Sequence, residues 1–171
     1  MKEALNYSWS TKQFTIEQNP HFLEMGVFLW IFDWDAIPHL GMSKDGKYFS
    51  STIRGIQKNE DSKKFWRLAE FKNTPLFVML LNTENINLIE LDRCFQTSIS
   101  VRTTCLEPIK LALSVQDGAI EIVSDLIKIL SDRKCISQVI ANSINSEGTI
   151  FLNRYNKADV LALIHHKIAA L

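Results

Sequence analysis

A turn between two short strands is the feature that most constrains how this chain can fold. Residues 39–43 have the pattern of a short strand, and residues 47–52, rich in aromatic and hydroxyl side chains, have that of a second one. The residues between them include Asp45-Gly46, and Asp-Gly is among the dipeptides most typical of a tight β-hairpin turn. We therefore expect an antiparallel hairpin that begins at His39 and organises the rest of the chain.

Other apolar stretches predict further strands. Residues 22–33 form a dense apolar run whose aromatic and β-branched side chains favour a central strand buried on both faces. Residues 75–81 are equally apolar, and a proline is tolerated at the first position of such a strand. Shorter patterns predict an edge strand within residues 10–17 and strands at residues 97–102 and 148–154.

Most of the predicted helices come later in the chain. Apolar spacing and capping residues predict helices at residues 61–71, 103–114, 117–132 and from Asn156 onward, and residues 135–143 also suit a helix. Residues 53–59 either continue the hairpin or leave it, and residues 88–95 suit a strand or a helix. Strands first and helices later predict an α+β fold, in which helices pack against a mostly antiparallel sheet. No linker or repeat divides the 171 residues, so a single domain over residues 1–171 is expected.

Composition argues against several classes of protein. The 19 basic and 19 acidic residues cancel, so nothing predicts binding to a nucleic acid backbone. The N-terminal residues lack the apolar stretch of a signal peptide, and the run at residues 25–32 is too short for a membrane span. The three cysteines match neither a disulfide framework nor a metal motif, so a reducing cytoplasm is the expected location.

One cysteine is placed for chemistry. A thiolate nucleophile is stabilised at the start of a helix and beside a histidine. Thr104 and Glu107 have the spacing of a capping box, which would put Cys105 at the first helical position. Alternatively, Pro108 takes that position and Cys105 lies in the loop just before it. In both cases the sulfur lies close to the start of a helix. His39, at the start of a strand, could be held rigidly enough to act as its base.

This arrangement resembles the circularly permuted papain-like hydrolases related to NlpC/P60. The matching residues are His39-Leu40-Gly41, the hairpin through Tyr48-Phe49, and Cys105-Leu106, within roughly residues 34–113. The resemblance implies a permuted papain-like fold and a thiol hydrolase of amide or ester bonds, acting on a small molecule or a peptide. Cys105 would be the nucleophile, and its backbone N–H one oxyanion donor. His39 would be the base and no metal or organic cofactor would be needed.

The third catalytic position departs from the family pattern. Those families place a histidine, asparagine, glutamine or glutamate on the strand after the histidine, whereas this chain has Ser50, Ser51 and Thr52, of which Ser51 is the predicted orienting residue. The polar residue that precedes the cysteine in the families is Thr104 here. A non-catalytic binding or assembly domain with a degenerate site is therefore the alternative.

The alternative has its own support in the aromatic residues, which would form the core of an interface if they were exposed. These residues are Trp30, Phe32, Trp34, Tyr48, Phe49 and Trp66. The sequence leaves open whether the chain forms a homo-oligomer. The two hypotheses differ at Cys105, which should be accessible beside His39 in an enzyme and buried and unpaired in a binding domain.

Overall fold

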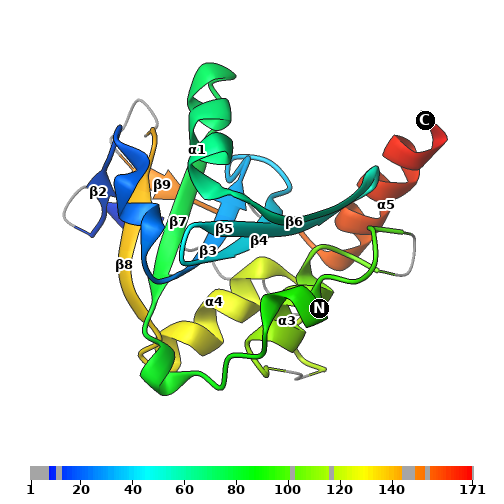
Figure 1. Cartoon of the computed structure of the whole chain (residues 1–171). Coiled ribbons are helices and arrows are strands. Elements are labelled where there is room, and N and C mark those ends of the chain that lie inside the picture. The colour runs from blue at the N-terminus through cyan, green and yellow to red at the C-terminus, as the bar shows by residue number, and fades with distance from the viewer. Residues whose placement is uncertain are drawn as a thin grey trace.

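The structure is a computed structural model that describes residues 8–10, 13–100, 103–115, 118–143, 149–152 and 155–170 (Figure 1). Its centre is a seven-stranded sheet with the order β2-β8-β7-β3-β4-β5-β6, in which only β2 and β8 run parallel among the described pairs. Its strands are β2 (Thr15–Ile16), β3 (Val27–Phe32), β4 (His39–Lys44), β5 (Lys47–Thr52), β6 (Gly55–Asp61), β7 (Leu76–Leu81) and β8 (Ile136–Ala141). Two further strands, β1 (Ser8–Ser10) and β9 (Thr149–Phe151), pair with each other. The predicted α+β fold with a mostly antiparallel sheet is confirmed.

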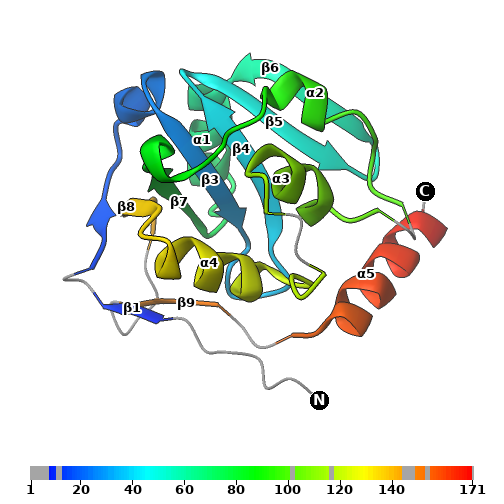
Figure 2. The same ribbon diagram turned by 90° about the horizontal axis from the view of Figure 1, so that it is seen from below.

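Helices cover both faces of this sheet (Figures 1 and 2). One face packs against α2 (Leu91–Cys94), α3 (Leu106–Ala112) and α4 (Val123–Asp132). The other packs against α1 (Ser62–Phe71) and the short 3-10 helix η1 (Pro20–Glu24). A second 3-10 helix, η2 (Thr83–Asn85), follows β7, and α5 (Lys157–Ala169) stands beside the sheet in both views. We call the two sides the α3 face and the α1 face.

The predicted hairpin is confirmed. Lys44 pairs with Lys47 and Met42 with Phe49, across a turn in which Asp45 and Gly46 have φ values of 48° and 79°. Positive φ at both central residues is the geometry that suits the right-handed twist of paired strands. The pairing of β4 with β5 stops at Met42, so the first three residues of β4 lie beyond the paired part.

The two apolar runs form the centre of the sheet, as predicted. β3 pairs with β4 on one side and with β7 on the other, and its first five residues are buried. It begins at Val27, later than predicted, because the Asn19 side chain and Pro20 start η1 and Gly26 takes a φ of 100°. Its alternate side chains therefore enter both cores.

Gly41 has a packing reason to be a glycine. A Cβ atom there would lie 2.7 Å from two carbons of the Tyr48 ring and even nearer to its hydroxyl oxygen. Tyr48 cannot retreat easily, because its ring stacks on Phe65 at a centroid distance of 4.2 Å and meets Trp30 at 5.0 Å. The glycine of the His39-Leu40-Gly41 segment is thus accounted for by core packing.

The capped helices at residues 61–71 and after Asn156 are confirmed. The Asp61 side chain accepts the Lys63 backbone N–H at 3.0 Å at the start of α1. Asn156 and Asp159 form a reciprocal capping box at the start of α5. The helix predicted at residues 117–132 begins at Val123, and residue 117 lies outside the described residues.

Two segments differ from prediction. Residues 135–143 contain a strand, β8, instead of a helix, because they pair with β7 and β2 and so fill a position within the sheet. Residues 97–100 form a loop instead of a strand, held to β5 by the Ile99 N–H on the Thr52 carbonyl at 3.0 Å; residues 101–102 lie outside the described residues. The sequence leaves the structure of two segments open. Most of residues 53–59 belong to β6, which adds a third strand to the hairpin, and residues 88–95 contain α2.

The aromatic residues that would have formed an exposed interface are core residues instead. Trp30, Trp34, Tyr48, Phe49 and Trp66 are all buried, while Phe32 is partly buried. Their burial removes the basis for an aromatic docking surface. It also explains their density, because two layers of helices enclose the central strands.

No helix within the described ranges has both the length and the apolar character needed to cross a bilayer.

Candidate functional site

Cys105 lies immediately before the first residue of α3, on the α3 face. The Leu106 backbone N–H donates to the Thr104 hydroxyl at 3.3 Å, and Pro108 sits in the first turn. Burial raises the pKa of the Cys105 thiol to about 11, although backbone hydrogen bonds with Leu40 and with its own amide, and the charge of Lys167, act against that rise. The thiol is therefore protonated at neutral pH and lacks the thiolate that a nucleophile requires.

His39 lies on the α1 face. It pairs with Phe32 of β3, and their ring centroids are 6.0 Å apart. Phe32 in turn stacks on Trp30, in the core beneath α1. Burial, and secondly the positive charge of Lys167, lowers the pKa of His39 to about 4. The imidazole is neutral at pH 7.

The structure does not bring the predicted nucleophile and base together. Leu40 belongs to the core on the α3 face, where Cys105 packs, and successive side chains of a strand point to opposite faces. His39 therefore projects away from the face that carries the thiol, and no hydrogen bond joins these two described residues. A general base must lie within hydrogen-bond reach of the proton that it removes. This geometry does not support a Cys105–His39 pair.

The three candidate orienting residues are each engaged elsewhere. The Ser51 hydroxyl points to the α3 face and donates to the Thr97 carbonyl at 2.7 Å. On the other face, the Ser50 hydroxyl donates to Gln57 Oε1 at 2.6 Å and that of Thr52 donates to the Gly55 carbonyl at 2.9 Å. None of these hydroxyl protons is directed to His39.

The reactivity of Cys105 tests this placement. We expect its alkylation by iodoacetamide to rise only at pH values above the ordinary thiol pKa of about 8.5, because burial favours the neutral thiol. The variant His39→Gln should leave that profile unchanged. Peptide mass spectrometry measures the extent of alkylation at each cysteine across pH 6–11, with Cys94 and Cys135 as internal references. If Cys105 is alkylated rapidly near neutral pH and His39→Gln abolishes that reaction, the result would support a thiolate–imidazole pair after all.

A cleft opens where the end of the sheet meets α5. It has a volume of about 900 Å³, larger than the hollows of about 360 and 250 Å³ found elsewhere on the molecule. Phe32, His39 and Thr52 contribute from the sheet, Arg54 from the turn between β5 and β6, and Lys167 from α5. Small-molecule sites are typically clefts of about 300–1,000 Å³ with apolar walls and a few polar groups.

Lys167 is the cation that acts on the titratable groups of the cleft. Its ammonium group influences both His39 and Asp33, which also line the cleft. Burial, and secondly the neighbouring carboxylate of Asp35, raises the pKa of Asp33, while Lys167 acts in the opposite direction. Lys167 and Arg54 are both exposed, and neither forms an ion pair with any residue that the structure describes. The cleft therefore presents cations that are available to a ligand.

The His39 imidazole is a half-buried polar group that lines this cleft. Neither ring nitrogen has a hydrogen-bond partner among the described residues, although most of the side chain is removed from solvent. A neutral imidazole offers one donor and one acceptor. Both are open to a bound molecule or to water, because no described residue occupies them.

Sequence reasoning missed Arg54 and Lys167 as site residues. Arg54 enters the cleft because residues 55–61 fold back as a third strand, and Lys167 enters because α5 lies beside that turn. Their separation along the chain carries no local signal of this meeting. Gly55, with a φ of 146°, is the one local hint of the turn.

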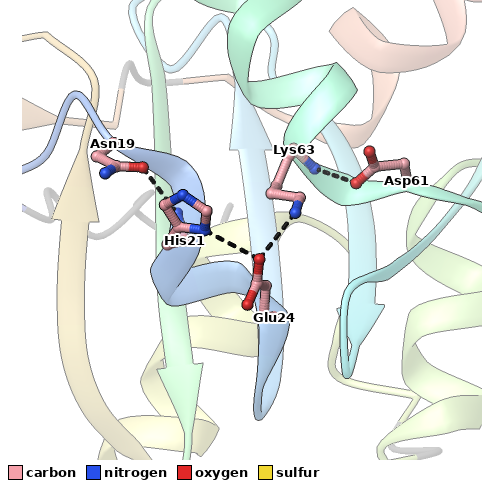
Figure 3. A network of polar contacts seen from close by, with 5 residues as sticks. All are labelled: Asn19, His21, Glu24, Asp61 and Lys63. Carbon is pink, nitrogen blue, oxygen red and sulfur yellow. Dashed lines mark hydrogen bonds and ion pairs between the residues drawn. The ribbon is translucent and has the colours of Figure 1, made fainter.

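A polar network between η1 and α1 was also missed (Figure 3). Glu24 Oε1 lies 2.8 Å from Lys63 Nζ and 2.9 Å from His21 Nδ1, while the His21 backbone N–H donates to Asn19. The hydrogen bond from Lys63, followed by that from His21, lowers the pKa of Glu24 to about 2. The network ties two elements of the α1 face together on an exposed surface.

Removing one cation should be visible in the titration of Glu24. We expect Lys63→Met to raise the Glu24 pKa from about 2 toward its ordinary value of 4.5, because the principal hydrogen bond is lost. Carboxyl chemical shifts followed by NMR during an acid titration measure the change. Lys64→Met, which removes the neighbouring partner of Glu60, is the control and should leave Glu24 unaffected. An unchanged Glu24 pKa in Lys63→Met would contradict the assigned contact.

Among the described residues, no three histidine, cysteine, aspartate or glutamate side chains gather as a metal site would require. Comparison with known proteins adds no assignment to this geometry: the chain matches no family model, no curated protein and no solved structure.

Proposed function

We propose that this chain is a non-catalytic binding domain that takes a small molecule into the cleft beside α5. The observation that carries the proposal is the neutral His39 imidazole, which faces the cleft without a hydrogen-bond partner among the described residues. A ligand would supply that partner. The free cations at the rim and the partly buried Phe32 provide the mixed lining of a small-molecule site.

The same features favour binding over thiol hydrolysis. Hydrolysis would require the Cys105 sulfur to meet the His39 imidazole, but the two lie on opposite faces and burial keeps the thiol protonated. Cys105 lies outside the residues that line the cleft. A molecule bound beside His39 would therefore not face the predicted nucleophile.

Blocking the cleft tests the proposal. Ala170 is exposed and lines the cleft, so a tryptophan there should occupy it without disturbing the core. We expect members of a library of small acids, amides and alcohols to shift the amide NMR signals of Thr52, Arg54 and Lys167 in the wild type. Ala170→Trp should weaken this binding about tenfold or more, since a ligand and an indole cannot share the space.

Ala169→Trp is the matched control, because Ala169 is its exposed neighbour and does not line the cleft. It should bind as the wild type does. The proposal fails if no library member shifts the cleft signals, or if Ala170→Trp binds as well as Ala169→Trp. It also fails if the wild type hydrolyses p-nitrophenyl esters at a rate that Cys105→Ala abolishes.

A further inference from the structure

We propose that the cleft recognises a monocarboxylate with an apolar body, bound at its charged end by Arg54 and Lys167. The inference rests on the proposed function and adds to it the chemical class of the ligand. It follows from what lines the cleft: two cations at the rim, an unpaired imidazole and partly buried apolar side chains.

The charge at the rim suits a single negative charge. Among the groups that line the cleft, Arg54 and Lys167 carry two positive charges and Asp33 carries one negative charge, while the Asp35 carboxylate lies beside Asp33 outside the lining. His39 is neutral at pH 7 and does not alter this balance. A monoanion would neutralise the rim, whereas a phosphate monoester would bring close to two negative charges beside Asp33.

The two cations come from different elements of the fold. Arg54 belongs to the turn between β5 and β6, and Lys167 belongs to α5. An arginine guanidinium matches the planar geometry of a carboxylate, and a lysine ammonium adds a compact second charge. Since neither forms an ion pair with a described residue, a ligand would not have to displace an internal partner.

Part of the remaining lining, which also includes polar residues such as Thr52 and Gln57, suits the apolar body of a ligand. Phe32, Ile53 and Ile99 are partly buried and present apolar surface to the cleft. His39 packs against Phe32 and offers a hydrogen bond at the sheet side of the cleft. The body of the ligand would therefore lie along these side chains, with its carboxylate at the exposed rim.

Matched acids and amides test the inference. The probes are 2-naphthoate with 2-naphthamide and octanoate with octanamide, each titrated into the full chain by calorimetry and by amide NMR. We expect each acid to bind about tenfold more tightly than its amide, because charge-assisted hydrogen bonds are the stronger ones. Arg54→Gln and Lys167→Gln should each weaken binding of the acid about three- to tenfold and leave the amide unchanged.

Lys64→Gln is the control variant, because Lys64 is an exposed cation of α1 away from the cleft. It should bind both probes as the wild type does. Thermal unfolding of each variant confirms that it is folded, and the preference for the acid should shrink as salt is raised.

The failures of the two proposals can be told apart. If an amide binds as tightly as its acid and Ala170→Trp blocks both, the carboxylate inference is overturned while the binding cleft stands. If 2-naphthyl phosphate binds more tightly than 2-naphthoate, a dianion is preferred and the inference is overturned. If no acid shifts the cleft signals, the inference is overturned too, and the wider library then decides whether the binding function falls with it.

Discussion

Replacing Trp30 by alanine should cost about 4 kcal/mol in the free energy of unfolding. Trp30 is fully buried, with its ring centroid 5.0 Å from that of Tyr48 and 6.3 Å from that of Trp66. Its indole N–H also donates to the buried Ser43 hydroxyl at 2.8 Å. The substitution would leave a large cavity at the centre of the α1 face and deprive Ser43 of that partner. Urea unfolding at pH 7 measures the loss, which corresponds to a fall of roughly 10 °C in Tm.

Phe71→Ala is the matched control, since Phe71 is an aromatic residue of α1 that is 85% exposed. It should change the free energy of unfolding by less than about 0.5 kcal/mol. Trp30→Phe should fall between the two, because it keeps a ring but loses the hydrogen bond to Ser43. Equal stabilities for Trp30→Ala and Phe71→Ala would contradict the assigned packing of the α1 face.

Acid should destabilise the chain by about 3 kcal/mol through His39 alone. Burial and the charge of Lys167 lower the pKa of His39 from its ordinary value of 6.5 to about 4 in the folded chain. Between these values the unfolded chain binds a proton that the folded chain does not, so stability falls as the pH decreases from 6.5 to 4. Above pH 6.5 both states are neutral at this residue and the full stability is present.

Comparing His39→Gln with the wild type isolates this effect from the carboxylates that also titrate in acid. We expect urea unfolding at pH 7 and pH 4 to show that the wild type loses about 3 kcal/mol more than His39→Gln does. Phe71→Ala, which removes an exposed side chain without a titratable group, should retain the wild-type pH dependence. Parallel pH profiles for the wild type and His39→Gln would show that His39 is free to ionise in the folded chain.

Local chemistry was sufficient to predict the hairpin and the helix starts. Asp45-Gly46 favours positive φ at two successive residues, and the side chains of Asp61 and Asn156 satisfy the first backbone N–H groups of their helices. β3 and β7 were predicted because an unbroken apolar run fits a strand buried on both faces. These signals act within a few residues and require no knowledge of distant partners.

The prediction failed where partners far along the chain decide the structure. Residues 136–141 carry apolar side chains that suit a helix or a strand, and pairing with β7 selects the strand. The alternating residues 97–100 suit a strand in isolation, but they make only a few hydrogen bonds to the end of β5. Short apolar patterns are ambiguous because both kinds of structure can bury them.

The same distinction between local signals and distant partners applies to the candidate site. The start of a helix at Cys105 and the start of a strand at His39 were both predicted from neighbouring residues, and both are confirmed. Whether the two side chains meet depends on the pairing of His39 with Phe32, which turns the imidazole to the α1 face, and on α3 packing against the other face. A shift of one residue in that pairing would reverse the direction of every side chain in β4.

The amino-acid sequence by itself determined the α+β class, the hairpin, the two central strands and the capped helices, because each follows from backbone preferences and apolar spacing over a short stretch. Only the tertiary structure decided which face each side chain occupies, and it brought Arg54, His39 and Lys167 to one cleft. The physical reason is that strand register and helix docking are set by burial summed over the whole core. No single segment of the chain encodes that sum.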